Sequence, residues 1–420
     1  MKKTLIAIAA AAAVATSAFA EITFGAWGRG VVVPVASNGD GTQAFETTSW
    51  GGQPRVGFEI NGGSENIGFT VKMNGDNGGS IEIHDEAKIW AKPFDFLKLQ
   101  MGRIQNNTLR GDWCYGSWNW LRQSWIADEG FTFSNFENTG MQVELFPVEG
   151  LYIAVGVPLK KNGWNKDGEA WVYGSGEDGD KFAGDVGETY RNAVVQAAYT
   201  IAGIGQIKAA YRGSNKLVKK DVNGKLVNDD YEGKIVNDGY NKGVIEAAFA
   251  SRGDNALVEG LGFEVGVAYD LTSKDDGGAD TKVALGVSYS GIENLGLTAS
   301  AAVFIPKNTD DYWEKDKDGK DVVNSKKLYV QAGVGVDYTL ADAGITLNAD
   351  VRFQTKKTDN GETNVGFLVG AAKGFSNGKV GIGFQATTKG GFAGGLTGRD
   401  KANEDDKLTW CVPVVIEYWF

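Results

Sequence analysis

Hydrophobic and polar residues alternate with a period of two along most of the chain. Apolar side chains occupy every second position of 263–269, 283–289 and 345–353, and polar or small side chains lie between them. Strict alternation over such lengths is typical of β-strands with one apolar face and one polar face. No stretch of comparable length has helical periodicity, so the pattern predicts an all-β fold.

The alternating segments number eighteen, or sixteen if the two weakest, 81–91 and 243–252, are left out. Each segment has the length of one strand. We expect strands at 22–33, 54–61, 64–74, 81–91, 95–103, 140–147, 151–159, 189–200, 204–212, 243–252, 261–271, 281–290, 295–305, 327–340, 345–355, 363–374, 378–389 and 408–420.

The connections between these strands alternate between short and long. Short ones include 62–63, 201–203 and 375–377. A chain that spans a membrane with strands must close its sheet, and outer-membrane barrels have short periplasmic turns and long extracellular loops. Both chain ends fall on the short-turn side, which predicts a transmembrane antiparallel β-barrel of about 18 strands (16 possible). The long loops are 34–53, 104–139, 160–188, 213–242, 306–326 and 390–407.

The first twenty residues have the pattern of a secretory signal peptide. Two lysines precede a short, alanine-rich apolar run, and Ala18-Phe19-Ala20 fits the small-x-small cleavage pattern. We therefore expect 1–20 to be a cleaved signal and 21–420 to be a single barrel domain of the outer membrane, in contact with lipid. The net charge of -11 argues against nucleic acid as a partner.

The last strand supplies a second export signature. Its alternate residues predict a lipid-facing row of Leu408, Trp410, Val412, Val414, Ile416, Tyr418 and Phe420. The end of this row resembles the C-terminal strand signature of bacterial outer-membrane proteins. That resemblance implies recognition by the barrel-assembly machinery through Val414, Ile416, Tyr418 and Phe420.

The opposite parity predicts which residues face the interior. The inward positions mix basic and acidic side chains with small ones, and this suits water better than a packed core. Sixteen or eighteen strands leave room for an aqueous channel, although loops that plug the interior are an alternative. On the first five strands the basic residues outnumber the acidic ones and predict a basic wall. The expected pore-lining residues are Arg29, Arg55, Lys72, Lys88, Lys98, Asp350 and Arg352.

The third long loop, 104–139, is the candidate for narrowing the pore. Its many tryptophans are not expected in a loop surrounded by water, and folding into the barrel would cover them. By position and composition it resembles the constriction loop of general porins, in which acidic residues face a basic cluster. A cap at the mouth and a sugar-stacking platform are alternatives. The residues concerned are Asp112, Trp113, Trp118, Trp120, Trp125, Asp128 and Glu129.

Two cysteines offer a way to hold this loop inside the barrel. Cys114 lies in the loop, and Cys411 lies on the last strand with inward parity. Exported thiols can be oxidised, so a Cys114–Cys411 disulfide is one hypothesis.

The sequence offers little catalytic chemistry. Its single histidine, His84, precedes Asp85 on a predicted strand, where adjacent side chains point to opposite faces. The sequence lacks a serine-hydrolase elbow, a phosphate-binding loop and zinc-ligand spacing. We therefore expect a protein that is not an enzyme and has neither a cofactor nor a metal site.

The predicted architecture and the two ends of the mature chain resemble those of known families. The whole chain resembles bacterial porins, and the segments EITFGAWGRG and EYWF are similar to treponemal major outer-sheath or surface proteins. This resemblance implies an abundant surface porin that also contacts host molecules, and general porins imply a trimer. The leading interpretation is a channel for passive diffusion of small hydrophilic solutes. An adhesin that displays 160–188, 213–242 and 306–326, and a sugar-selective channel, are alternatives.

Overall fold

The computed structural model describes residues 21–37, 42–47, 55–75, 81–109, 133, 136–158, 190–214, 217–227, 233–315, 320–388 and 408–420. The expected signal peptide, 1–20, lies outside these ranges. The barrel strands are β1 (Glu21–Ser37), β3 (Arg55–Gly63), β4 (Ile67–Gly75), β5 (Ile81–Phe94), β6 (Leu97–Gln105), β7 (Glu137–Leu145), β8 (Leu151–Pro158), β9 (Val194–Ile201), β10 (Gly205–Arg212), β13 (Val244–Ser251), β14 (Leu261–Asp270), β15 (Thr281–Ile292), β16 (Leu295–Ile305), β19 (Tyr329–Leu340), β20 (Ile345–Gln354), β21 (Asn364–Phe375), β22 (Gly378–Thr388) and β23 (Leu408–Trp419).

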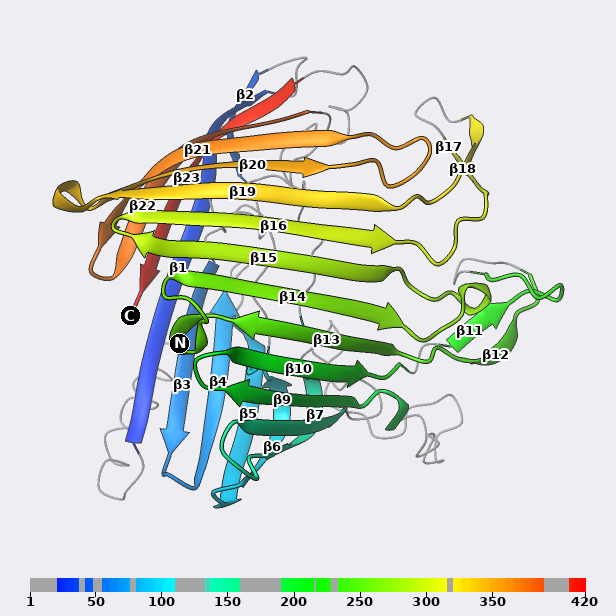
Figure 1. Cartoon of the computed structure of the whole chain (residues 1–420), viewed down its shortest axis with the longest axis horizontal. Coiled ribbons are helices and arrows are strands. Elements are labelled where there is room, and N and C mark those ends of the chain that lie inside the picture. Colours follow the sequence, from blue (N-terminus) through cyan, green and yellow to red (C-terminus); the bar gives the residue numbers. More distant parts are fainter. Residues whose placement is uncertain are drawn as a thin grey trace.

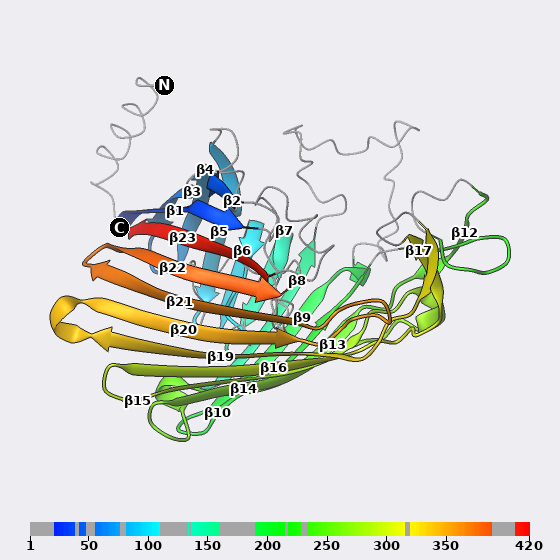
Figure 2. The ribbon, with the colours of Figure 1, turned by 90° about the horizontal axis from the view of Figure 1, so that it is seen from above.

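These strands form one closed antiparallel ring of eighteen positions. Each strand pairs with the next along the chain, and β23 pairs with β1 from Trp27↔Trp419 to Ser37↔Trp410. The short strand β2 (Thr42–Thr47) pairs with the outer half of β1 and lies in line with β3, so it adds no further position to the ring. Figure 2 shows the strands curving round an interior, and in Figure 1 the strands of opposite walls cross, as tilted barrel strands do.

All eighteen predicted strands are confirmed, with shifts at their ends. The largest error is at β9, which begins at Val194 and not at 189. The preceding residues close a turn instead, because the amide of Ala193 donates to the carbonyl of Tyr190 at 3.1 Å. Strand β1 is longer than expected and continues to Ser37.

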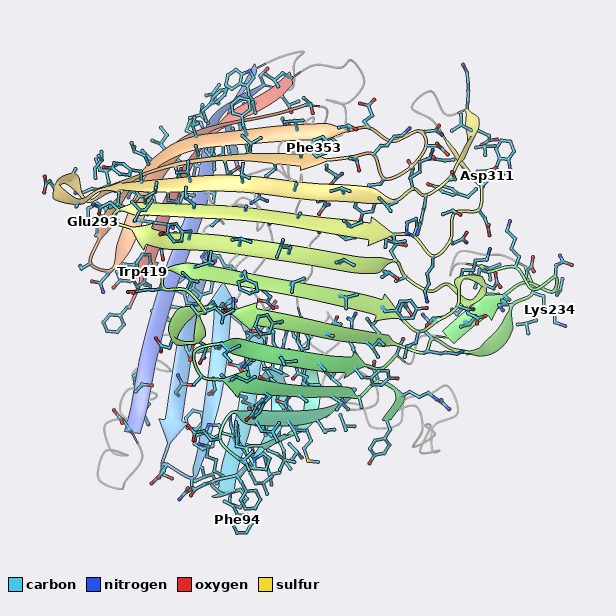
Figure 3. All side chains as sticks on the ribbon, viewed as in Figure 1. Phe94, Lys234, Glu293, Asp311, Phe353 and Trp419 are labelled. Carbon is cyan, nitrogen blue, oxygen red and sulfur yellow. The ribbon has the colours of Figure 1, made fainter. Side chains whose placement is uncertain are left out.

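The connections are sorted by length between the two ends of the barrel. The end with the chain termini has tight turns, such as η4 (Ala341–Ala343) and the turn at Gly203, whose φ of 70° favours glycine. The other end has the β11 (Leu217–Lys220)–β12 (Val236–Tyr240) and β17 (Tyr312–Lys315)–β18 (Asp321–Asn324) pairs. In Figure 3, Glu293 and Trp419 mark the first end, and Lys234 and Asp311 mark the second.

The two faces of the sheet differ as the parity predicts. On β14, Val265, Val267 and Tyr269 are exposed on the outside, whereas Glu264 and Ala268 are buried on the inside. On β23 the outer row ends in exposed Ile416, Tyr418 and Phe420, whereas the inner-row residues Cys411, Val415 and Glu417 are buried. An outward apolar surface of this kind suits lipid. Within the described ranges, no helix is both long enough and apolar enough to cross a bilayer.

Candidate pore lining and loop anchor

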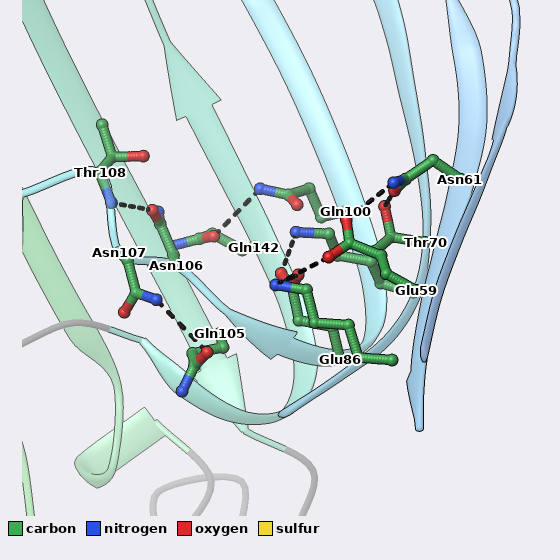
Figure 4. A network of polar contacts seen from close by, with 12 residues as sticks. Glu59, Asn61, Thr70, Glu86, Gln100, Gln105, Asn106, Asn107, Thr108 and Gln142 are labelled. Atoms are coloured by element: carbon green, nitrogen blue, oxygen red, sulfur yellow. Dashed lines mark hydrogen bonds and ion pairs between the residues drawn. The ribbon is translucent and has the colours of Figure 1, made fainter. Parts of the chain in front are cut away.

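Charged side chains of both signs form a ladder across β3, β4 and β5 inside the barrel. Lys72 Nζ lies 2.8 Å from a carboxylate oxygen of Glu86 and 4.0 Å from one of Glu59. Lys88 pairs with the other oxygen of Glu86. Figure 4 shows Glu59 also accepting a hydrogen bond of 2.7 Å from Asn61. The ladder spans three strands because neighbouring inward residues lie close enough to pair.

A second ladder joins the strands that close the ring. Glu417 on β23 lies 3.7 Å from Arg29 Nε on β1 and 2.7 Å from Lys379 Nζ on β22. Both basic side chains are about one-third exposed, whereas Glu417 is buried. The ring closure is therefore held by ion pairs on its inner face in addition to the main-chain ladder.

The expected basic wall carries both signs of charge. Its basic residues lie on the adjacent strands β1 and β3 to β6, as predicted. However, Lys72 and Lys88 pair with Glu86, and Lys98 lies 3.2 Å from Glu144 on β7. The carboxylates come from strand neighbours that parity places on the same face, so the wall is a mixed ladder rather than a purely basic surface.

Glu144 is the centre of a buried polar cluster at the start of the third long loop. It accepts hydrogen bonds from the hydroxyl of Tyr152 at 2.6 Å and from the amide of Gln100 at 2.7 Å. The amide of Asn106, just after β6, donates to Glu144 at 3.2 Å and to the Tyr152 hydroxyl at 2.7 Å. Figure 4 shows Asn106 beside Gln142 and Gln100. The loop therefore leaves β6 from a fixed point on the inner wall.

Both described ends of the loop contact one lysine that lies much later in the sequence. The carbonyl of Leu109 lies 3.4 Å from Lys208 Nζ on β10, and the same ammonium lies 5.3 Å from the centre of the Phe133 ring. Lys208 is 1% exposed and pairs with Glu264 at 2.5 Å. Leu109 and Phe133 are buried inside the barrel, so the loop enters the interior on both sides of 110–132.

Small inward residues make room for the loop on this wall. Leu109 and Phe133 belong to one buried cluster with an inward alanine from each successive strand between β8 and β16. Farther along, the Phe136 ring lies over Gly156, where an added Cβ would come within 2.3 Å of it. The alanines are Ala154, Ala198, Ala210, Ala248, Ala268, Ala284 and Ala302.

The central part of the loop stays a prediction. Asp112, Trp113, Trp118, Trp120, Trp125, Asp128 and Glu129 lie outside the described residues, and so does Cys114. Cys411 is a buried free thiol, which contradicts the disulfide hypothesis. Cys411 does lie on the inner face, as predicted, but its side chain packs against Val33 and Ala36 of β1.

Two of the predicted lining residues are buried on the inner face. Asp350 and Arg352 are on the inward row of β20, as parity predicts, but they are 3% and 0% exposed. By contrast, Arg29, Lys72 and Lys98 remain partly exposed. His84 lies on β5, and its side chain is outside the described part.

The parity of its strand places Lys208 on the inner face, but the sequence does not reveal that it holds the loop. The contact with Leu109 joins residues 99 positions apart, so no local pattern reports it. The row of inward alanines is the signal that was available. An open channel does not require small residues at one level of one wall, but a loop packed against that wall does.

Neighbouring outer loops are linked by carboxylates. Asp276 accepts from Ser273 at 2.7 Å and pairs with Lys220 at 2.8 Å, which ties 271–280 to β11. Asp359 pairs with Lys327 and accepts from Ser325 at 2.5 Å. The hydrogen bond and charge from a lysine lower the pKa of Asp276, and the same cause lowers the pKa of Asp359.

Comparisons with known proteins find similar solved structures at low identity. No protein-family model and no curated protein matches the sequence. The anion-selective porin from Comamonas acidovorans has 11% identity and a TM-score of 0.47, over 96% of this chain and 100% of that one. OmpF of Salmonella typhi in complex with daunomycin has 13% identity and a TM-score of 0.46, over 95% and 97%. The trimer form of OmpT, an outer membrane protein of Vibrio cholerae, has 12% identity and a TM-score of 0.43, over 96% of this chain and 100% of that one.

Proposed function

We propose that the mature chain is an outer-membrane porin, a water-filled channel for passive diffusion of small hydrophilic solutes and ions. The observation that carries this proposal is a closed ring of eighteen strands whose inner face holds partly exposed charges of both signs. A barrel of this strand number is too wide for wall side chains alone to fill. Charged residues that face an interior rather than lipid are suited to water.

The third long loop sets the width of this channel in our proposal. Its start is held by Glu144 and Lys208 on different strands, and Phe133 on the other side of 110–132 lies against the same lysine. A loop anchored at both sides of 110–132 cannot swing freely out of the mouth. We propose that this segment narrows the pore, with Asp112, Trp113, Trp118, Trp120, Asp128 and Glu129 as its constriction residues.

Liposome swelling tests the channel and its width. Protein comprising residues 21–420 is refolded into liposomes that are then diluted into solutions of sugars of increasing size. We expect rapid swelling with small sugars and a steep loss of rate as the sugars become larger. Swelling that is no faster than in protein-free liposomes, from correctly folded protein, would contradict the proposal.

Partners follow from the same proposal. The chain meets outer-membrane lipid on its apolar outer face and the barrel-assembly machinery through its last strand, and we expect a homo-oligomer, with a trimer as the specific hypothesis.

A display role, with contact to host molecules, is a second candidate function. It is supported by the ion pairs and hydrogen bonds that join the outer loops, because linked loops present one continuous surface.

A further inference from the structure

Two prolines face each other across the strand pair that closes the ring. Pro34 lies within β1 and Pro413 within β23, whereas the other described prolines lie at or beside strand ends or in connections. The register shifts between Val32 and Val35, so Val33 and Pro34 together lie opposite Pro413 in a β-bulge. Proline has no N–H, and in sheets it is confined to edges and bulges. This part of the closure therefore resembles two sheet edges laid together rather than a continuous sheet.

The ladder is interrupted on the other side of Pro413 as well. Strand β23 pairs with β22 from Leu408 to Cys411 and again from Val414 to Tyr418. Pro413 thus separates β23 into an outer part and an inner part. The two parts are joined through a residue that donates no main-chain hydrogen bond to either neighbouring strand.

The two parts of the closure are held unequally. Nearer the chain termini, β1 and β23 pair without interruption from Trp27 to Val32, and Glu417 adds ion pairs with both neighbouring strands. Outward of the prolines, β1 pairs with β23 only over 35–37. This outer part of β1 also pairs with β2, and that of β23 also pairs with β22. Each would therefore keep one neighbour if the two separated. Figure 2 shows β1 and β23 side by side at this place.

The inner wall at this seam is apolar, in contrast to the charged ladders elsewhere on the inner face. Its apolar side chains are at most 9% exposed, so the seam is closed in this structure. The alternate residues of β23 face the lipid and are apolar as well. The apolar inward residues are Val31, Val33 and Ala36 of β1, Cys411 and Val415 of β23, and Leu368 of β21.

We propose that the outer part of the β1–β23 seam opens laterally and gives apolar molecules a passage between the barrel interior and the hydrocarbon core of the membrane. This inference goes beyond the proposed channel, whose solutes are hydrophilic. A molecule on this path meets Val33 and Cys411 on the inside and Val412 on the outside. Unpaired main-chain groups are costly in lipid, and the two prolines reduce the cost of opening because they have no N–H to lose.

Cys411 reports the opening, because it lies on the inner face beside the seam. In Cys114→Ser, Cys411 is the only cysteine of the chain. This protein is refolded into liposomes and treated with N-(1-pyrenyl)maleimide dissolved in the lipid, or with a sulfonated maleimide in the water. Intact mass spectrometry measures the adduct, and each rate is divided by the rate with unfolded protein. We expect the apolar reagent to label the folded protein and the charged reagent to react much more slowly.

The two prolines should set the labelling rate. Pro34→Val with Pro413→Val, in the Cys114→Ser protein, restores two N–H groups to the seam. This double variant should slow labelling by the apolar reagent roughly tenfold, because added hydrogen bonds favour the closed seam. Pro158→Val is the matched control, because Pro158 ends β8 away from the seam, and it should leave the rate unchanged.

Three results would overturn the inference. The first is an apolar reagent that labels unfolded protein but not folded protein. The second is an equal relative rate for the two reagents, which would mean that Cys411 is reached from water. The third is an unchanged rate in the proline double variant.

Hydrogen exchange gives a second readout that needs no substitution. Peptides covering 35–37 and 410–412 should exchange faster than peptides covering 351–354 and 364–367. The latter lie at the same end of the barrel, where β20 and β21 pair without interruption. Equal protection of the two regions would contradict an opening seam, even if the proline double variant does not fold.

Discussion

Lys208 Nζ on β10 lies 3.4 Å from the carbonyl oxygen of Leu109, a residue 99 positions earlier in the chain. The same ammonium faces Phe133, so one buried lysine holds the third long loop at both sides of 110–132. Under the proposed role of this loop, Lys208, a residue outside the loop, therefore helps to set the pore width.

Replacing Lys208 should therefore change the channel and the stability together. Lys208→Met keeps most of the alkyl chain but removes the ammonium, and it leaves Glu264 with the more distant Arg252 at 3.6 Å. Removing one member of a buried pair costs about 3–5 kcal/mol. We expect a lower denaturant midpoint and a larger, less steady single-channel conductance.

A double variant separates these two effects. Lys208→Met with Glu264→Gln removes the uncompensated charge, so much of the stability should return while the conductance stays high. Lys282→Met is the control, because Lys282 lies on the inner face over Phe304 and not at the loop ends. A wild-type conductance in Lys208→Met would contradict the anchoring role.

The Tyr152 hydroxyl should contribute measurably to stability. It donates to buried Glu144 at 2.6 Å and accepts from Asn106 at 2.7 Å. Hydrogen bonds to charged groups contribute about 1.5–3 kcal/mol, so Tyr152→Phe should lower the free energy of unfolding by that amount. Denaturant titration of the folded protein in liposomes measures it. Tyr199→Phe, on the exposed outer face, should change it by less than about 0.5 kcal/mol. Equal effects of the two substitutions would rule out the proposed cluster.

The links between the outer loops should weaken in acid. The pKa values of Asp276 and Asp359 are lowered from 3.8 by their lysine and serine partners. A carboxylate with a lowered pKa in the folded state stabilises that state above the unfolded pKa, and the stabilisation is lost as pH falls through the folded value. The contacts should therefore be complete at pH 7 and lost progressively below about pH 4.

Hydrogen exchange detected by mass spectrometry checks this pH dependence. After correction for the intrinsic rate, peptides covering 320–328 and 355–363 should exchange faster at pH 3 than at pH 7. Asp359→Asn should exchange fast already at pH 7, whereas Asp254→Asn, in η2 (Gly253–Asn255) at the other end of the barrel, should behave like the wild type. Unchanged protection in Asp359→Asn would contradict the role of this carboxylate.

The end of the last strand should matter for assembly more than for the folded barrel. Phe420 is 74% exposed, and its contacts with Ala26 are main-chain hydrogen bonds that alanine can also make. Tyr418→Ala with Phe420→Ala should lower the amount of protein in the outer membrane severalfold. The same protein refolded from denaturant should conduct normally. Trp419→Ala, with the opposite parity, should assemble well; a comparable loss there would argue against a signal in the outer row.

The strands could be predicted from sequence because the signal for them is local. Alternation with a period of two is set by the lipid outside and the polar interior inside, and it recurs in each strand. The start of β9 was misplaced because Tyr190–Ala193 close a turn that the alternation alone does not reveal. Ring closure was predictable because both chain ends lie on the short-turn side.

The pairing of the inward charges was harder to predict from the sequence. Lys72 lies opposite an irregularity in β5, where the register shifts between Val71 and Met73 and Asp85 has a φ of 55°. This bulge determines which β5 carboxylate reaches Lys72, and parity counting assumes that no such insertion exists. The basic wall was therefore predicted as a set of residues but not as a ladder of pairs.

The loop anchor was the hardest feature to predict from the sequence, because it depends on contacts between distant segments. The contact of the Leu109 carbonyl with Lys208 is set by how the loop and β10 meet in three dimensions. Sequence alone identified the loop by its tryptophans but could not say which wall residues hold it.

Single-channel conductance of refolded residues 21–420 in a planar lipid bilayer tests the central claim most directly. We expect stable, ohmic steps, because a closed barrel with charged, partly exposed inward rows encloses a water-filled path. Correctly folded protein that inserts and carries no current would show that the interior is plugged. That result would contradict the channel function and favour the display role.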